Sequence, residues 1–190
     1  MATTTILLCG VGGQGTILAA DLLARAAMAS GKECKVSEIH GMAQRGGSVT
    51  TTVVFGEDVK TMIADLGESD FVVSFETTEA LRNLPYLKVG GKMLVSDETI
   101  KSLPVLTGAQ KMPAQAKEKL EAEGALIIPA VEMATKAGTA KASNVALLGA
   151  LSVFMDISEE IWEDVIAKRV PPKTIDKNLA AFKAGRAFAQ

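Results

Sequence analysis

The chain has 190 residues, 48% of them hydrophobic, and a formal net charge of −2 at pH 7. This length and apolar content are typical of one domain with a substantial core, and the lack of a basic excess argues against nucleic-acid and membrane-surface partners. Aromatic residues make up only 4% of the chain, which also disfavours a surface on which nucleic-acid bases stack.

Short apolar or β-branched runs that end at glycine or polar residues predict six strands. They are Thr4–Cys9, Glu33–Ser37, Ser48–Phe55, Asp70–Phe75, Lys92–Ser96 and Ala125–Ile128. Between the second and the third strand, the polar and glycine-rich segment Glu38–Gly47 predicts a loop without a helix. This departure from a regular strand–helix–strand rhythm predicts a partly mixed sheet.

Apolar residues at helical spacing predict helices between and after these strands. They are Thr16–Ser30, Thr77–Leu87, Ala114–Glu123, Asn144–Phe154, a helix that begins near Ser158, and Thr174–Phe188. Thr77 and Ser158 are candidate N-caps, and Leu103–Pro113 is predicted to be a loop. We therefore predict a three-layer α/β/α fold with a mostly parallel, partly mixed central sheet and a helical C-terminal third. We treat residues 1–190 as a single domain.

Two cysteines and one histidine limit the metal chemistry of the chain. Cys9 and Cys34 lie in predicted strands without a CxxC spacing, so we expect buried free thiols in a reducing cytoplasm. They do not supply the usual four ligands of an iron–sulfur cluster, and one histidine disfavours structural zinc. No apolar run reaches the roughly 18 residues of a spanning helix, and no signal peptide is recognised. We predict a cytoplasmic protein.

A glycine-rich turn joins the first predicted strand to the first predicted helix. The segment Gly10-Val11-Gly12-Gly13-Gln14-Gly15 permits positive φ and the close approach of a ligand, and the helix start that follows suits a phosphate or carboxylate. Gly10, Gly12 and Gly15 fit the dinucleotide fingerprint, and Glu33 or Glu38 supplies the acidic residue expected about 20 positions further on.

Gln14 weighs against a dinucleotide, because its amide is expected to project into the region of the pyrophosphate. The turn is then either half of another anion site or a tight strand-to-helix connection without a ligand. We take Gly10, Gly12, Gly13, Gln14 and Gly15 as candidate cofactor-binding residues.

A second polar segment runs from His40 to Ser48 and places the only histidine near Gln44 and Arg45. Arg45 is suited to hold a phosphate or carboxylate through two hydrogen bonds, and His40 to bind an anion or transfer a proton. The alternative is a solvated hairpin loop. Because open α/β sheets bind ligands where parallel strands end, we expect this loop and the glycine turn to emerge at one edge and form one anion-binding cleft.

Two further polar residues stand at the ends of predicted elements. Asn144 precedes the most apolar helix and either caps it or reaches the cleft. Glu76 follows a strand and is either a ligand contact or a charge at a helix N-terminus. The sequence shows no convincing carboxylate pair, Cys/His dyad, Walker lysine or metal-binding cluster. We therefore expect no catalytic residue and no metal ligand in this chain alone.

The glycine turn resembles the start of the γ subunit or domain of 2-oxoacid:ferredoxin oxidoreductases. The segment from Ser37 to Val49 is similar, more closely, to the β subunit of indolepyruvate:ferredoxin oxidoreductase. Further similar segments follow in order along nearly the whole chain: Leu84–Gly91, Asn144–Ala150 and Asn178–Phe182. No departure is seen within the two main motifs.

The resemblance implies a non-autonomous subunit in the oxidative decarboxylation of aryl 2-oxoacids to acyl-CoA, with ferredoxin as electron acceptor. Thiamine diphosphate, Mg and [4Fe-4S] clusters are then expected on a larger α subunit, and coenzyme A (CoA) as a substrate. The resemblance also implies an active-site role for this kind of subunit, and we assign the cleft to His40, Gln44, Arg45, Ser48 and Asn144. The alternatives are another 2-oxoacid (pyruvate, 2-oxoglutarate or branched-chain), an independent NAD(P)- or FAD-binding module, and a purely structural partner.

Overall fold

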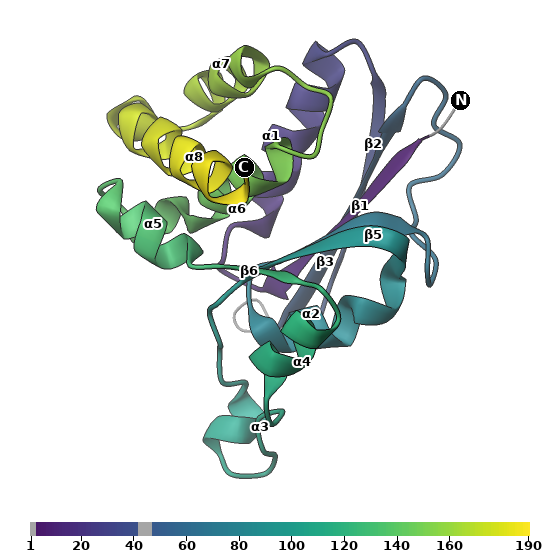
Figure 1. The fold of residues 1–190 in the computed structure, drawn as a ribbon, viewed down its shortest axis with the longest axis vertical. Coiled ribbons are helices and arrows are strands. Elements are labelled where there is room, and N and C mark those ends of the chain that lie inside the picture. Colours follow the sequence, from purple (N-terminus) through teal and green to yellow (C-terminus); the bar gives the residue numbers. More distant parts are fainter. Residues whose placement is uncertain (1–2, 42–46) are drawn as a thin grey trace.

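The computed structural model describes residues 3–41 and 47–190 and is built around a six-stranded sheet (Figure 1). The strands are β1 (Thr4–Val11), β2 (Glu33–His40), β3 (Ser48–Gly56), β4 (Ser69–Ser74), β5 (Leu87–Ser96) and β6 (Leu126–Ile128). Their spatial order is β2-β3-β1-β4-β5-β6. β3 pairs antiparallel with β2 and β1, and the other neighbours pair parallel. Every strand except β3 therefore runs in one direction, which confirms the predicted mostly parallel, partly mixed sheet.

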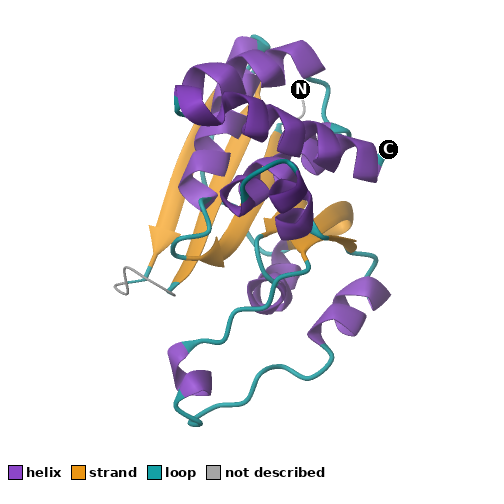
Figure 2. Cartoon of the chain, turned by 90° about the vertical axis from the view of Figure 1, so that its left-hand side faces the viewer, coloured by secondary structure: helices purple, strands orange, loops and turns teal. Residues whose placement is uncertain are grey.

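Helices cover both faces of the sheet (Figures 1 and 2). They are α1 (Thr16–Ala29), α2 (Thr77–Asn83), α3 (Leu103–Leu106), α4 (Ala116–Ala122), α5 (Ala130–Lys136), α6 (Ser143–Ser152), α7 (Glu159–Arg169) and α8 (Ile175–Ala189). Short 3-10 turns occupy Leu84–Tyr86, Ala140–Ala142 and Pro172–Thr174. The face with α1 and α5–α8 is the thicker layer, and α2 and α4 cover the other face. The α/β class and the helical C-terminal third are confirmed.

The larger core lies between the sheet and the C-terminal helices. It includes Leu8 of β1, Leu23 of α1, Leu147 of α6 and Phe182 of α8, all buried. α6 is buried from Asn144 to Ser152, as its almost wholly apolar sequence predicts. A smaller core joins the opposite face of the sheet to α2 and α4. Successive side chains of β1 alternate between the two cores, as expected for a strand that is buried on both faces of the sheet.

The structure corrects several predicted boundaries. β2 extends to His40, because all of its residues pair with β3 from Glu33↔Gly56 to His40↔Val49. The carboxylate of Glu76, not Thr77, caps α2 by accepting from the amides of Thr78 and Glu79. This matches the helix-end alternative for Glu76.

Three further differences concern helices. A short helix, α3, lies inside the segment 103–113 that was predicted to be a loop. The helix predicted to end at Leu87 ends at Asn83, because Pro85 and its neighbours form a 3-10 turn instead. Ser158 stands at the N-cap of α7 without a side-chain hydrogen bond. None of the helices in residues 3–41 and 47–190 has the length and apolarity needed to cross a bilayer.

Candidate functional site

The glycine turn lies at the carboxyl edge of the sheet, between β1 and α1. Gly13 and Gly15 have φ of +104° and +82°, a region that side-chain-bearing residues rarely adopt. A Cβ on Gly13 would meet no atom within 4 Å, so this part of the turn is open. The first helical bond of α1 runs from the Ala19 amide to the Gly15 carbonyl, and no described side chain caps the helix start. The amides at the beginning of α1 are therefore available to an anion.

Gln14 turns back under the glycine turn instead of projecting toward a ligand. Its Oε1 accepts from the amide of Val11 at 2.9 Å, and its Nε2 donates to the carbonyl of Phe75 at 2.8 Å. A Cβ on Gly10 would lie 2.7 Å from this Oε1. Gln14 thus ties the end of β1 to the end of β4, and the expectation that its amide enters the pyrophosphate region is wrong.

Asn144 reaches the same turn from the thick helical layer. It is the second residue of α6 and not its cap, because Ala142 holds the cap position without a side-chain bond. Its Nδ2 donates to the carbonyl of Gly15 at 3.1 Å, and a Cβ on Gly15 would lie only 2.5 Å from that nitrogen. The helix-capping alternative for Asn144 is therefore corrected, and the side chain lies against the glycine turn.

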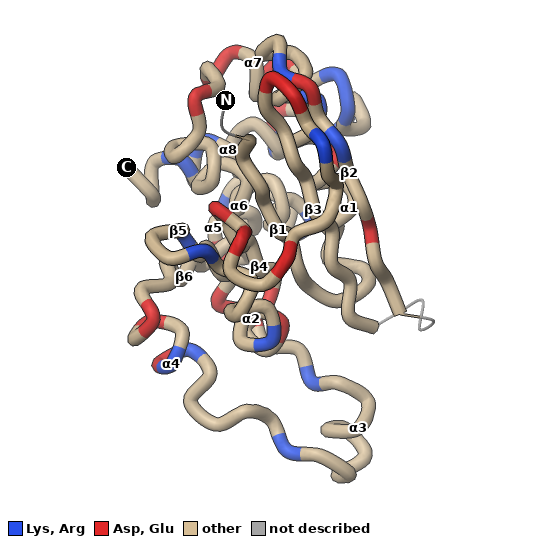
Figure 3. The backbone as a smooth tube through the Cα atoms, turned by 90° about the vertical axis from the view of Figure 1, so that its right-hand side faces the viewer, with Lys and Arg blue, Asp and Glu red and all other residues tan. Residues whose placement is uncertain are grey.

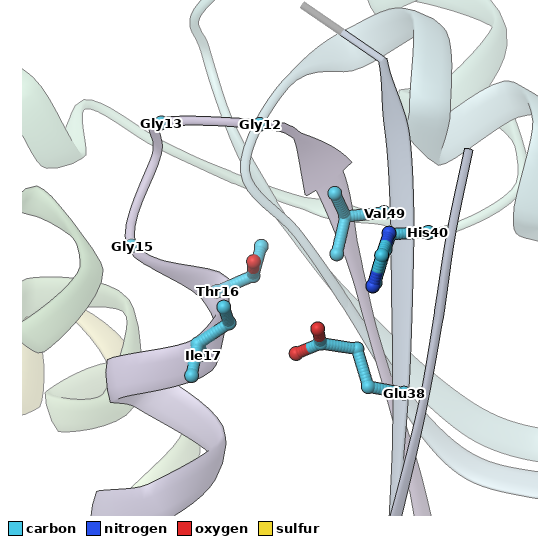
Figure 4. Close-up of a pocket in the computed structure, with 8 residues that line it drawn as sticks. All are labelled: Gly12, Gly13, Gly15, Thr16, Ile17, Glu38, His40 and Val49. Carbon is cyan, nitrogen blue, oxygen red and sulfur yellow. The ribbon is translucent and has the colours of Figure 1, made fainter. Parts of the chain in front are cut away.

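A cavity of about 420 Å³ separates the glycine turn from the end of β2 and the start of β3 (Figure 4). One wall is formed by Gly12, Gly13, Gly15, Thr16 and Ile17, and the other by Glu38, His40 and Val49. The amide of Gly12 donates to the carbonyl of Gly47 at 2.9 Å, which joins the two loops directly. The prediction that both loops emerge at one edge of the sheet is confirmed.

The predicted residues of the second loop fall in three places. His40 lines the cavity. Ser48 instead donates from Oγ to Glu79 Oε2 at 2.6 Å, toward the α2 face of the sheet. Gln44 and Arg45 lie outside the described residues. The buried Glu79 was not singled out in the sequence, since helical periodicity gives no sign that a carboxylate faces inward.

The two acidic residues proposed as ribose contacts lie in different places, and only one of them lines the cavity. Glu33 accepts from the amide of Val59 at 3.0 Å, away from the cavity. Glu38 lines the cavity, and Figure 4 shows its carboxylate directed toward the start of α1. The cavity therefore offers free amides on one wall and a carboxylate on the other. Such a pair suits a ligand that carries both an anion and a hydroxyl or amine donor.

A second cavity of about 610 Å³ lies on the other side of the glycine turn. Gly13, Gln14 and Gly15 form part of its wall, with Asn144 and Lys141 near the start of α6 and Glu98 just after β5. Lys141 and Glu98 were not predicted to belong to a site. Glu98 follows a predicted strand at the carboxyl edge, which is a signal that points to this position.

Both cysteines are protonated thiols. Burial raises the pKa of the Cys9 thiol to about 12 and that of Cys34 to about 11, so neither is an ionised nucleophile at neutral pH. Across residues 3–41 and 47–190, no group of three or more His, Cys, Asp or Glu side chains is placed to hold a metal ion. The described residues of this chain therefore do not fit an iron–sulfur cluster.

These features define a class: an α/β protein with a mostly parallel sheet and two cavities at its carboxyl edge, where open α/β sheets commonly bind ligands. Comparison with known proteins identifies it further. The family "Pyruvate ferredoxin/flavodoxin oxidoreductase" matches residues 5–188. The chain belongs to this family, which confirms the resemblance seen in the sequence.

Relatives and solved structures agree with this assignment. The chain is 41% identical to the indolepyruvate oxidoreductase subunit IorB of Thermococcus kodakarensis, over 97% of this chain and 95% of that protein. The γ subunit of a keto/oxoacid ferredoxin oxidoreductase from Geobacter sulfurreducens shares the fold with a TM-score of 0.73 at 25% identity, covering 98% of both chains. The 2-oxoglutarate:ferredoxin oxidoreductase of Magnetococcus marinus, solved with 2-oxoglutarate, coenzyme A and succinyl-CoA, shares it with a TM-score of 0.75 at 23% identity. That match covers all of this chain but 31% of the other.

Proposed function

We propose that this chain is the smaller, non-autonomous subunit of an indolepyruvate (arylpyruvate):ferredoxin oxidoreductase. The complete enzyme converts an aryl 2-oxoacid and CoA to aryl-acyl-CoA and CO₂, and passes the electrons to ferredoxin. The observation that carries this proposal is the 41% identity to IorB along 97% of the chain. The family match and the fold agree with it.

The proposal assigns thiamine diphosphate, Mg and the [4Fe-4S] clusters to a larger partner subunit. This division is consistent with the described residues, in which no group of three or more His, Cys, Asp or Glu side chains is placed to hold a metal ion. When bound to that partner, thiamine diphosphate supplies the carbanion chemistry of decarboxylation. The role left to this chain is to bind and orient an anionic substrate at the border of the active site.

Within this chain, the glycine turn and the start of α1 are proposed to hold a phosphate of CoA. Gly13 is open to a ligand, and the first amides of α1 have no side-chain cap among the described residues. His40 faces them across the cavity of about 420 Å³, and Arg45 is proposed to add a bidentate contact. The Magnetococcus protein, which shares this fold, was solved with CoA.

The test is a steady-state analysis of the enzyme reconstituted with its larger subunit. His40→Ala and Arg45→Ala are expected to raise KM for CoA roughly tenfold each, the effect of losing one charge-assisted contact. Lys60→Ala, on the exposed segment after β3, is the matched control and should leave KM unchanged. Unaltered KM values for both CoA and the oxoacid in Arg45→Ala would favour a purely structural role. Activity of the isolated chain with aryl pyruvate and ferredoxin would contradict the non-autonomous reading.

One observation favours a second candidate, an independent NAD(P)- or FAD-binding module. The carboxylate of Glu38 faces the glycine turn across the cavity, as a ribose-binding acid does. This candidate predicts that the purified chain binds a dinucleotide and that Glu38→Ala weakens the binding. The inward position of Gln14 removes the objection that its amide enters the site, so the binding measurement decides. A panel of aryl, branched-chain and small 2-oxoacids identifies the substrate of the complete enzyme.

A further inference from the structure

The segment 97–119 forms an arm that projects from the body of the molecule (Figures 1 and 2). It leaves the sheet after Ser96 and returns at Leu120, and both of these residues are buried. Between them no residue is buried, and α3 lies near the tip. Apart from α3 and the start of α4, this connection is irregular, and long irregular connections in compact domains are usually functional.

Local hydrogen bonds, and not packing against the body, hold the tip of the arm in shape. The carbonyl of Ser102 accepts from the amides of Val105 and Leu106, and that of Pro104 accepts from the amide of Gln110. Leu103 and Leu106 of α3 nevertheless remain 72% and 66% exposed. An ordered tip that leaves two leucines in water is pre-shaped to bury them elsewhere, because each loses favourable burial energy while exposed.

The charge of the arm narrows the choice of partner. The acidic residues of the arm, Asp97, Glu98 and Glu118, all lie at its two ends, and Lys119 lies beside Glu118. The part between them, residues 99–117, carries only Lys101, Lys111 and Lys117, and Figure 3 shows basic positions along this otherwise uncharged stretch. The complementary surface is therefore an apolar groove with carboxylates at its rim. The arm also starts beside the candidate site, since Glu98 and Ile100 line the second cavity with Asn144.

We propose that this arm is the docking element by which the chain binds the larger subunit of its enzyme, with α3 seated in an apolar, acid-rimmed groove of that subunit. The inference rests on the proposed function. Two comparisons support the larger subunit as the partner of this arm. The matched region makes up 31% of a longer chain in one protein, but 95% of the IorB relative. A fold that occurs both inside a longer polypeptide and as a subunit needs a surface that replaces the covalent link. A partner seated on the arm would face the second cavity.

The experiment measures the dissociation constant between this chain and its purified larger subunit. The double variant Leu103→Asp/Leu106→Asp is expected to weaken binding by about 30-fold or more, the effect of losing an interface hot spot. The matched control is Ile63→Asp/Leu66→Asp, whose side chains are 62% and 68% exposed in the connection between β3 and β4, at the opposite end of the sheet. It should bind within about threefold of the native chain. Lys101→Glu/Lys111→Glu should slow association and remove part of its salt dependence.

The possible outcomes distinguish a failure of the docking proposal from a failure of the proposed function. Native-like binding by the leucine double variant, or an equal loss in the control, overturns the docking role and leaves the proposed function intact. Failure of the native chain to bind the larger subunit overturns both. The thermal midpoint of the free leucine variant should match that of the native chain, and a large decrease would show that the arm packs on its own body, which also overturns the inference.

Discussion

The thick helical layer and the carboxyl edge of the sheet follow opposite packing rules. In the helical layer, α6 and α8 approach so closely that a Cβ on Gly149 would lie 2.0 Å from the carbonyl oxygen of Phe182. At the carboxyl edge, Gly13 faces open space, two cavities flank the glycine turn, and the arm carries no buried residue. Glycine therefore serves close packing in one region and access in the other. The comparison shows that close packing in the helical layer coexists with open space at the edge of the sheet.

Two polar side chains connect these regions. Asn144 extends from the first turn of α6 to the carbonyl of Gly15, and Gln14 joins the ends of β1 and β4 beneath the turn. Their hydrogen bonds attach the glycine turn to α6 on one side and to the end of β4 on the other. The following substitutions test how far the two regions differ.

Gly185→Ala is expected to have the largest effect. A Cβ there would lie 1.9 Å from the carbonyl oxygen of Ala146, and backbone atoms cannot move aside as flexible side chains do. We expect a loss of about 3 kcal/mol or more from overpacking, although Gly→Ala in an open helix gains about 1 kcal/mol. Chemical denaturation measures the change, with the exposed Ala187→Gly as a control that should cost at most about 1 kcal/mol. A neutral Gly185→Ala would show that α6 and α8 can separate freely.

Gln14→Ala is expected to cost about 2 kcal/mol, because the amide of Val11 and the carbonyl of Phe75 lose their common partner in a partly buried site. The thermal midpoint should fall by roughly 4–8 °C at this size of chain. Gln14→Glu keeps an acceptor for Val11 but sets a carboxylate oxygen against the Phe75 carbonyl, so it should also destabilise. A neutral effect of either variant would contradict the bridging role.

Gly13→Ala is expected to destabilise by about 1 kcal/mol, because its positive φ strains an L-residue while no neighbouring atom obstructs the added methyl group. Gly15→Ala should cost more, since its methyl group would collide with Asn144 Nδ2. Unfolding curves for the two variants measure the difference. If Gly13→Ala destabilised the chain more than Gly15→Ala, the open space around Gly13 would not account for the difference between the two glycines.

Arg169→Ala should have the smallest effect, about 0.5 kcal/mol, as expected for an exposed pair. Arg169 of α7 and Arg25 both hydrogen-bond Asp21 of α1. Partial burial alone would raise the pKa of Asp21, but these bonds outweigh it and hold the pKa below its ordinary 3.8. The contribution is therefore present above pH 3.8 and is lost as the pH falls through the lowered value. Stability measured from pH 7 to pH 2 should show the native and variant curves converging.

Local sequence patterns predicted the helices and strands better than the details of the carboxyl edge of the sheet. The apolar run of α6 predicted burial on most sides, and the glycine after β1 predicted the turn. The strand order was not predictable, because the pairing of β1 with β3 depends on contacts between distant residues. For the same reason β2 was predicted too short: nothing local indicates that Glu38 and His40 pair with Thr51 and Val49.

At the candidate site, residue types predicted location but not orientation. The sequence placed the glycine turn and His40 at one edge, and the structure brings them to one cavity. It did not predict that Gln14 turns inward or that Ser48 points to Glu79, because each depends on an acceptor from another element. Gly10 and Gly15 fit a dinucleotide motif, yet they make room for Gln14 and Asn144 of the same chain.

The place of β1 has a consequence for how the chain is made. β1 is synthesised before the other five strands of this sheet, but it lies inside the sheet, between β3 and β4. Its partners span residues 48–55 on one side and 71–74 on the other. Since chains are synthesised at about 5–20 residues per second, β1 spends the first seconds after its synthesis as an apolar strand with two unpaired edges. The glycine turn that ends it can take its native shape only after Phe75 has been added to hold Gln14.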